Sequence, residues 1–291
     1  MLRCHYFLMV VTILIFSIRL SAQELPYFVT YSHHMEESGS LEIESKLTSG
    51  KPNGGNRFVG FPSEFEYGTR AWWTTELYLE GQTTSNDSTV FTGFRIENRA
   101  RLLLEEHRVN PVLYFEFEDI NGANKSILEV VGHDGQDDFD GSNAETRAEK
   151  KRELELKLIL SSNAKGWNFS ENFIGEKNVK HAPWEFGYAL ATSRPLRLAG
   201  STSTSAFAPQ NFAAGVEMYG GLGDTDSLTL AQTSDYIGPT FNWAIPNGPT
   251  ISASPNFGLT DHSLPRIYRI EVGYEIGQLS RFFHPRKGGP H

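Results

Sequence analysis

Long segments in which apolar and polar residues alternate constrain the fold of this chain more than any other feature. Near the C-terminal end, Ile270 and Val272 alternate with Arg269 and Glu271. Successive side chains of a β-strand point to opposite faces, so such a segment predicts a strand with one apolar and one charged face. Three further segments show the same alternation: 40–47, 110–120 and 153–160. We find no convincing amphipathic helix after the first 22 residues, so the predicted fold class is all-β.

The length of these segments favours a membrane barrel over a soluble sheet. They run to about 9–12 residues, whereas strands of soluble proteins average about 5–6. A strand that crosses a bilayer at a tilt needs about 9–11 residues. Aromatic residues also gather near the segment ends, as in the girdles of outer-membrane barrels: Phe61, Phe65, Trp72, Trp73, Tyr114, Trp167, Trp184, Phe186, Tyr219, Tyr236, Trp243, Tyr268 and Tyr274. We therefore predict a closed antiparallel up-and-down transmembrane β-barrel, with a soluble all-β domain as the alternative.

The segments give a strand count and an orientation. About twelve strands are predicted, and ten or fourteen are also compatible with the pattern: 40–47, 57–68, 70–81, 89–98, 110–120, 152–162, 166–177, 183–193, 212–222, 235–245, 248–260 and 266–276. Short connections follow the second, sixth and tenth strands, and most odd-numbered connections are longer and polar. Bacterial barrels have short periplasmic turns and long extracellular loops, so both termini are expected in the periplasm. The connections 98–109 and 194–211 are too long for tight turns, and the first could hold a short helix.

The first 22 residues are typical of a secretory signal peptide. Arg3 is followed by an uncharged, mostly apolar run of 13 residues, 6–18, and the stretch 20–22 ends in small residues that fit a cleavage site. Such a run is shorter than the roughly 20 residues of a membrane-spanning helix, which argues against an uncleaved anchor. Cleavage would remove Cys4, the only cysteine, and the loss of Arg3 and Arg19 would change the formal charge from −9 to −11. An exported chain without cysteine fits a bacterial envelope better than eukaryotic secretion.

The remaining chain divides into three parts. Residues 23–38 precede the first counted strand and could form a periplasmic segment, a plug or an extra strand. Residues 39–277 form the expected barrel, and residues 278–291 form a C-terminal tail. The acidic excess would repel phosphate, so nucleic acid is not an expected partner.

The signal peptide, the alternating strands and the last strand, 268–276, together resemble bacterial outer-membrane β-barrel proteins, in particular transporter-like or porin-like ones. The resemblance covers about residues 23–277 and implies insertion in the outer membrane. It also implies outer-membrane lipid, lipopolysaccharide, the barrel-insertion machinery and small solutes as partners. One departure is that such barrels usually end in an aromatic residue, whereas here residues 277–291 follow the last strand.

The polar faces of the strands supply the candidate site. In the predicted register, a set of charged side chains lines the lumen: Glu42, Glu44, Lys46, Glu76, Glu80, Arg95, Glu116, Glu118, Glu153, Glu155, Lys157, Arg269, Glu271 and Glu275. Charges inside a barrel must be paired or hydrated. The lumen is therefore either a hydrated conduit that favours cations or polar solutes, or a closed interior braced by Glu–Arg and Glu–Lys pairs.

Other candidate sites are weaker. The acidic loop 132–141 offers the oxygen ligands that calcium prefers, but the spacing of Asp134, Asp137, Asp138 and Asp140 differs from a twelve-residue calcium loop. The neighbouring His33 and His34 would point to opposite faces of a strand and so could not readily chelate one ion unless the strand breaks. No nucleophile, P-loop, dinucleotide or zinc motif is present. We expect no cofactor and no enzymatic activity.

The sequence thus predicts porin-like or transporter-like passage of small solutes through an acidic lumen. One alternative is a structural or adhesive outer-membrane barrel with partner-binding extracellular loops. Another is a soluble, secreted carbohydrate-binding β-sandwich. The pattern does not indicate an oligomeric state.

Overall fold

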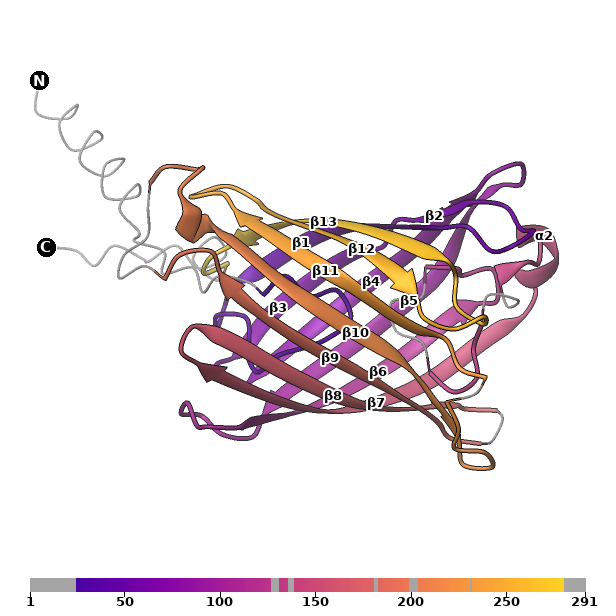
Figure 1. The fold of residues 1–291 in the computed structure, drawn as a ribbon, viewed down its shortest axis with the longest axis horizontal. Helices are drawn as coiled ribbons and strands as arrows, with labels where there is room; N and C mark the ends of the chain where they lie inside the picture. Colours follow the sequence, from indigo (N-terminus) through magenta and orange to yellow (C-terminus); the bar gives the residue numbers. More distant parts are fainter. Residues whose placement is uncertain are drawn as a thin grey trace, which may run out of the picture.

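A single antiparallel sheet closes on itself to form a barrel (Figure 1). The computed structural model describes residues 25–126, 131–135, 139–180, 183–198, 204–230 and 232–279. The predicted signal peptide and nearly all of the predicted C-terminal tail lie outside these residues. In the part of the chain that the structure describes, no helix has the length and hydrophobicity needed to span a membrane.

Apart from β2 and β3, each strand pairs with its neighbour in sequence, and the last strand pairs with the first over ten residues, which closes the barrel. The strands are β1 (Leu41–Gly50), β2 (Phe58–Gly60), β3 (Ser63–Arg70), β4 (Trp73–Thr84), β5 (Thr89–Arg101), β6 (Asn110–Asn121), β7 (Lys150–Ala164), β8 (Trp167–Asn178), β9 (Glu185–Pro195), β10 (Phe212–Asp224), β11 (Asp235–Ala244), β12 (Thr250–Gly258) and β13 (Arg266–Ile276).

The short strands β2 and β3 occupy one place in the barrel. Both pair with β1 on one side and with β4 on the other, and only Phe61 and Pro62 separate them. The barrel therefore has twelve strand positions, as predicted. The two-sheet sandwich that the sequence left open is wrong, because the strands belong to one closed sheet.

The two ends of the barrel differ, and β1 begins at the same end at which β13 finishes, because Leu41 pairs with Ile276 (Figure 1). We call this the turn end. It carries tight turns such as 165–166, the connection 102–109, and the connection 196–211 with a 3-10 helix, Pro209–Asn211. The other end, the loop end, carries the long connection 122–149 with the short helix α2 (Asn143–Thr146). The helix considered for 98–109 was wrong: β5 continues to Arg101, and 102–109 contains no helix.

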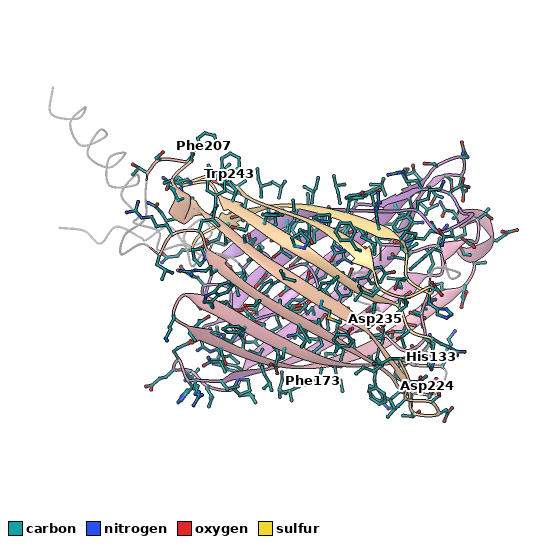
Figure 2. All side chains as sticks on the ribbon, viewed as in Figure 1. His133, Phe173, Phe207, Asp224, Asp235 and Trp243 are labelled. Carbon is teal, nitrogen blue, oxygen red and sulfur yellow. The ribbon has the colours of Figure 1, made fainter. Side chains whose placement is uncertain are left out.

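The strands place apolar side chains outside and polar side chains inside. Along β13, Tyr268, Ile270 and Val272 are exposed, whereas Arg269 and Glu271 between them are buried. Figure 2 shows Phe173 projecting outward from β8 in the same way, and its side chain is 50% exposed. The exterior is thus apolar over its strands, as a lipid-facing wall requires.

Three of the aromatic residues assigned to girdles are inside the barrel instead. Tyr114, Tyr219 and Tyr236 are at most 2% exposed. They occupy inward positions of their strands, so the number of aromatic residues near strand ends overestimated the size of the girdle. Trp72 and Trp167 at the turn end are exposed, as a girdle needs.

Candidate functional site

The charged side chains expected in the lumen lie on the inner face of the barrel. Of the fourteen, only Glu153 and Glu275 are half-buried, and the other twelve are buried, with exposures from 0% for Glu116 to 9% for Lys46. They are buried because each occupies an inward position between two lipid-facing ones. The full set is Glu42, Glu44, Lys46, Glu76, Glu80, Arg95, Glu116, Glu118, Glu153, Glu155, Lys157, Arg269, Glu271 and Glu275.

Ten carboxylates on ten neighbouring strands form a continuous row, which we call the glutamate ladder. Each member is the register partner of the next: Glu275, Glu42, Glu66, Glu76, Glu97, Glu116, Glu155, Glu176, Glu185 and Asp224. The row begins near the turn end, where Glu42 is the second residue of β1. It ends at the loop end, where Asp224 is the last residue of β10. The ladder therefore runs the full height of the barrel.

Such a row is costly for folding. Directly opposite residues have Cβ atoms about 5 Å apart, and like charges at that distance destabilise a sheet. A barrel that only needed a braced interior would alternate acids with bases. The ladder is consequently a feature for which a role beyond stability should be sought.

Basic side chains neutralise only part of the ladder. Arg99 contacts Glu66 at 2.6 Å, Glu76, and Glu97 at 3.2 Å. Arg95 lies 3.1 Å from Glu116, and it also binds Glu80, beside the ladder, at 2.9 Å. Two lysines complete the set: Lys157 with Glu155 (2.9 Å), and Lys46 with Glu64 (2.5 Å), Glu44 (3.2 Å) and Glu271 (3.3 Å). The braced arrangement that the sequence left open is thus present in the middle of the barrel.

Three tyrosines fill the lumen at this height, and we call them the tyrosine layer: Tyr31, Tyr78 and Tyr114. Arg95 lies over the ring of Tyr78 at 4.2 Å, and Lys157 over that of Tyr114 at 4.2 Å. Tyr78 and Tyr114 are 0% and 2% exposed. The layer lies between two cavities that share no lining residue, one of about 170 Å³ toward the turn end and one toward the loop end.

Tyr31 belongs to the N-terminal segment, residues 25–38, which lies inside the turn-end half of the barrel (indigo in Figure 1). The segment contains no strand. Its Tyr31 hydroxyl donates to Glu97 at 2.8 Å, and its ring lies 5.2 Å from that of Tyr114. The Tyr31 backbone exchanges two hydrogen bonds with the Asn172 side chain, of 2.6 and 2.9 Å. The segment thus contributes the third side chain of the tyrosine layer.

One carboxylate holds the middle of this segment. Glu217 of β10, which is fully buried, accepts hydrogen bonds from three successive backbone N–H groups: Phe28 (3.2 Å), Val29 (2.8 Å) and Thr30 (2.7 Å). Successive N–H groups that converge on one anion form a nest, and bonds to a charged acceptor are stronger than neutral ones. Glu217 is therefore the main anchor of the segment.

His33 links the end of the segment to the barrel wall. Its Nδ1 lies 2.8 Å from Ser161 Oγ and its Nε2 lies 2.9 Å from Glu106 Oε2. Burial lowers the pKa of His33 despite the nearby Glu106 carboxylate. Since residues 25–40 are not a strand, the expected separation of His33 and His34 was wrong: their rings lie 4.6 Å apart.

The order Ser161–His33–Glu106 resembles the hydrogen-bond relay of a serine hydrolase. Ser161, however, is only 1% exposed and does not line either cavity described here. Its Oγ also accepts a 3.2 Å hydrogen bond from Asn168 Nδ2. The relay lacks access for a substrate, and its position indicates a structural link.

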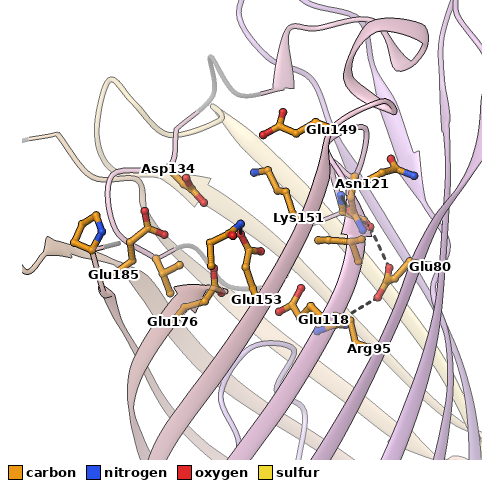
Figure 3. Close-up of a pocket in the computed structure, with 16 residues that line it drawn as sticks. Glu80, Arg95, Glu118, Asn121, Asp134, Glu149, Lys151, Glu153, Glu176 and Glu185 are labelled. Atoms are coloured by element: carbon orange, nitrogen blue, oxygen red, sulfur yellow. Dashed lines mark hydrogen bonds and ion pairs between the residues drawn. The ribbon is translucent and has the colours of Figure 1, made fainter. Parts of the chain in front are cut away.

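The second cavity, which we call the outer vestibule, lies at the loop end and has a volume of about 230 Å³ (Figure 3). Its polar lining comes from Glu80, Arg95, Glu118, Asn121, Asn124, Ser126, Asp134, Glu149, Lys151, Glu153, Glu176, Asn178 and Glu185, and its apolar lining from Ile120, Val131 and Pro183. Connection 122–149 contributes to its cover, because Gly132 N–H donates to the Phe186 carbonyl of β9 at 3.0 Å.

The aspartates of the acidic loop 132–141, which the sequence suggested for calcium, do not all lie in the outer vestibule. Asp134 lines the outer vestibule, whereas Asp140 is exposed. Asp137 and Asp138 lie outside the described residues. Among the described residues, the one set of three acidic or histidine ligands close enough for a metal is Glu64, Glu66 and Glu76, and Lys46 and Arg99 already contact it.

Several functional residues were not among those predicted for the lumen. Arg99 was missed because β5 was expected to end at residue 98, whereas the strand continues to Arg101. Glu97 lies within the predicted strand and could have been found from its alternation with Arg95. Glu176 and Glu217 also follow the inward period of their strands and could have been found from it. No periodic signal marked Tyr31 or His33, because their segment is irregular.

Comparison with known proteins found similar solved structures but no related family. No protein-family model matches the chain, and no curated protein matches it. Similar solved structures include the NanC porin (10% identity, TM-score 0.47, 81% of this chain and 100% of that one). An outer membrane channel from Pseudomonas putida F1 is 11% identical with a TM-score of 0.46, covering 84% of this chain and 97% of that one. The KdgM porin, in complex with disordered oligogalacturonate, is 8% identical with a TM-score of 0.44, covering 81% and 98%.

Proposed function

We propose that this protein is a gated channel of the bacterial outer membrane that passes small cations or cationic polar solutes. Export by the N-terminal signal and insertion by the barrel machinery would bring it there. The apolar exterior supports the membrane location, because a barrel that exposes Leu47, Phe115 and Ile270 needs lipid around it.

The glutamate ladder carries the proposal. It offers a carboxylate on each of ten neighbouring strands, so a cation that enters at one end meets a new acidic group with each step along the wall. Rings of acidic side chains favour cations in channels, and conduction requires several sites of moderate strength rather than one strong one. The repulsion within the ladder is relieved when a cation lies between its members.

The N-terminal segment supports a gate rather than a permanently open pore. Tyr31 completes the tyrosine layer, and Glu217 holds the segment through backbone amides. Hydrogen bonds from backbone N–H groups to one carboxylate can break and re-form without unfolding any strand. Withdrawal of residues 25–38 would remove Tyr31 and leave Tyr78 and Tyr114 on the wall.

Conductance across a planar bilayer tests the function. The purified full-length chain should give channel openings whose reversal potential in a salt gradient indicates cation preference. Glu118→Gln, on the inner face of β6, should reduce that preference. Glu171→Gln is the matched control because Glu171 is exposed on the outer face of β8. Absence of conductance at any voltage, both in the natural chain and in Glu217→Gln with its loosened segment, would overturn the proposal in favour of a structural barrel.

Location is tested separately. Cells that produce the chain should retain it in the outer-membrane fraction, where it should need detergent for extraction and show heat-modifiable gel mobility. Full solubility in buffer would contradict the membrane assignment, whatever the conductance result.

A further inference from the structure

The outer vestibule contains more negative charge than the protein itself neutralises. Seven carboxylates line it, against two basic side chains, Arg95 and Lys151. Arg95 is already engaged, since it lies 2.9 Å from Glu80 and 3.1 Å from Glu116. A cavity with this imbalance attracts cations, and its low-dielectric walls strengthen that attraction.

Glu176 is the residue that points to a ligand. Its side chain lines the vestibule, and it is only 9% exposed. Among the residues that the structure describes, none donates a hydrogen bond to Glu176 or forms an ion pair with it. Buried carboxylates are normally paired, because an unpaired one loses its hydration without compensation. Glu176 therefore lacks the basic partner that Glu76, Glu97, Glu116 and Glu155 of the ladder have in Arg99, Arg95 or Lys157.

The acidic residues around Glu176 further favour a bound cation. Glu176 lies directly between Glu155 and Glu185 in the strand register. Beside this row, Glu118 of β6 is the register partner of Glu153 of β7. Figure 3 shows Glu118, Glu153 and Glu176 converging on one space from three successive strands. Opposed like charges of this kind are stabilised when a cation lies between them.

The spacing of the vestibule carboxylates indicates which kind of cation the cavity can bind. A divalent metal ion bound directly needs several oxygen ligands around one point. The described carboxylates of the vestibule include no set of three close enough for that, whereas Glu64, Glu66 and Glu76 elsewhere form one. Negative charge is instead spread along the cavity. A ligand with two or more separated positive groups fits such a distribution better than a single ion.

The apolar part of the lining narrows the choice further. Ile120, Val131 and Pro183 lie in the same cavity as the carboxylates. They suit a methylene chain, which a hydrated metal ion does not have. Neighbouring ladder positions are about 5 Å apart, a spacing that two ammonium groups on a chain of three or four methylenes can match.

We propose that the outer vestibule binds an aliphatic diamine or short polyamine, with one ammonium group at Glu176 and another toward Glu118 and Glu153. Diamines and polyamines would then be the solute class of the channel, and their passage through the barrel rests on the proposed function. Binding itself requires the vestibule alone. Glu176 is the residue on which affinity depends most, because none of the residues that the structure describes donates a hydrogen bond to it or pairs with it.

Calorimetry on the full-length chain in detergent tests the site, with putrescine and spermidine as probes. Both should bind, and spermidine should bind more tightly because it carries an additional charge. Glu176→Gln should raise Kd at least tenfold, whereas Glu171→Gln on the opposite face of the same strand should leave it unchanged. Heat-modifiable mobility of each variant confirms that it forms a barrel.

Three results would overturn the site. They are equal binding by Glu176→Gln, equal binding of the uncharged analogue 1,4-butanediol, and Mg²⁺ binding as tight as that of spermidine at the same ionic strength. Failure of this proposal is distinguishable from failure of the channel. Diamine binding without conductance would contradict passage and leave the site standing, whereas cation conductance without diamine binding would contradict the site alone.

Discussion

Glu217 allows the gate to be tested by one isosteric change. In Glu217→Gln, the amide oxygen can still accept from Phe28, Val29 and Thr30, whose nitrogens lie 3.2, 2.8 and 2.7 Å from Glu217 Oε1. The charge is lost, however. A hydrogen bond to a charged group contributes about 1 kcal/mol more than a neutral one, so three bonds lose about 3 kcal/mol.

Part of this loss is recovered. A neutral side chain costs less to bury than a carboxylate, which offsets about 1 kcal/mol. The docked segment should therefore lose about 2 kcal/mol relative to the undocked one. Since about 1.4 kcal/mol corresponds to a factor of ten, the undocked population should rise about 30-fold.

Thiol labelling measures that population. The natural chain has one cysteine, Cys4, so Cys4→Ser combined with Val29→Cys places a single thiol in the segment. Val29 is 1% exposed when docked, so a maleimide reaches it only after undocking. The labelling rate should increase about 30-fold in Glu217→Gln. Glu105→Gln, at an exposed position of connection 102–109, is the matched control and should leave the rate unchanged.

A labelling rate within threefold of the natural one in Glu217→Gln would refute the reasoning. It would mean that contacts other than the carboxylate hold the segment. Equal acceleration by Glu105→Gln would also refute it, because the effect would then be a general consequence of lost charge.

Three further outcomes are expected. Tyr31→Ala should increase channel open probability by removing the segment's part of the tyrosine layer, whereas Tyr67→Ala, on the exposed exterior, should not; single-channel recording compares them. Acidification through about pH 6.5 should speed Val29→Cys labelling relative to a cysteine on the exposed exterior, which corrects for the loss of thiolate. The reason is that burial lowers the pKa of docked His33, and lowers that of His34 to about 4, so the neutral rings dock and the undocked rings take up protons first. Glu106 opposes both shifts and Arg101 adds to them; a pH-independent ratio would contradict the reasoning, and replacing both His33 and His34 by Asn should remove the dependence. Leu158→Arg, on the lipid-facing side of β7, should destabilise the barrel in vesicles by about 2–4 kcal/mol, measured by urea unfolding, and a change below 1 kcal/mol would argue against lipid contact there.

Local patterns made much of the barrel predictable. The alternation of Arg269 and Glu271 with Ile270 and Val272 fixes both strand and facing, because a strand has only two faces. Twelve strand positions and the inward placement of the fourteen charged residues followed from the same rule. The glutamate ladder did not, because it depends on the register between strands, which alternation within one strand does not specify.

The position of the N-terminal segment could not be predicted from such patterns. Tyr31 contacts Glu97 and Asn172, which lie 66 and 141 residues away in sequence. The segment around it has no regular period, because its hydrogen bonds go to side chains of the wall and not to a neighbouring strand. Its place in the lumen could be anticipated only as one of three options.

The seam between β1 and β13 has a consequence for the kinetics of folding. Its ten paired residues join 41–50 to 267–276, so its contacts span almost the whole chain. Pairings of this kind form slowly, since the loop that they close is long and its entropy must be lost first. Lys46 lies at this seam and contacts Glu44 on β1, Glu64 on β3 and Glu271 on β13. One ammonium group thus joins the first strands to the last, and the lateral opening of the barrel must break its contact with β13.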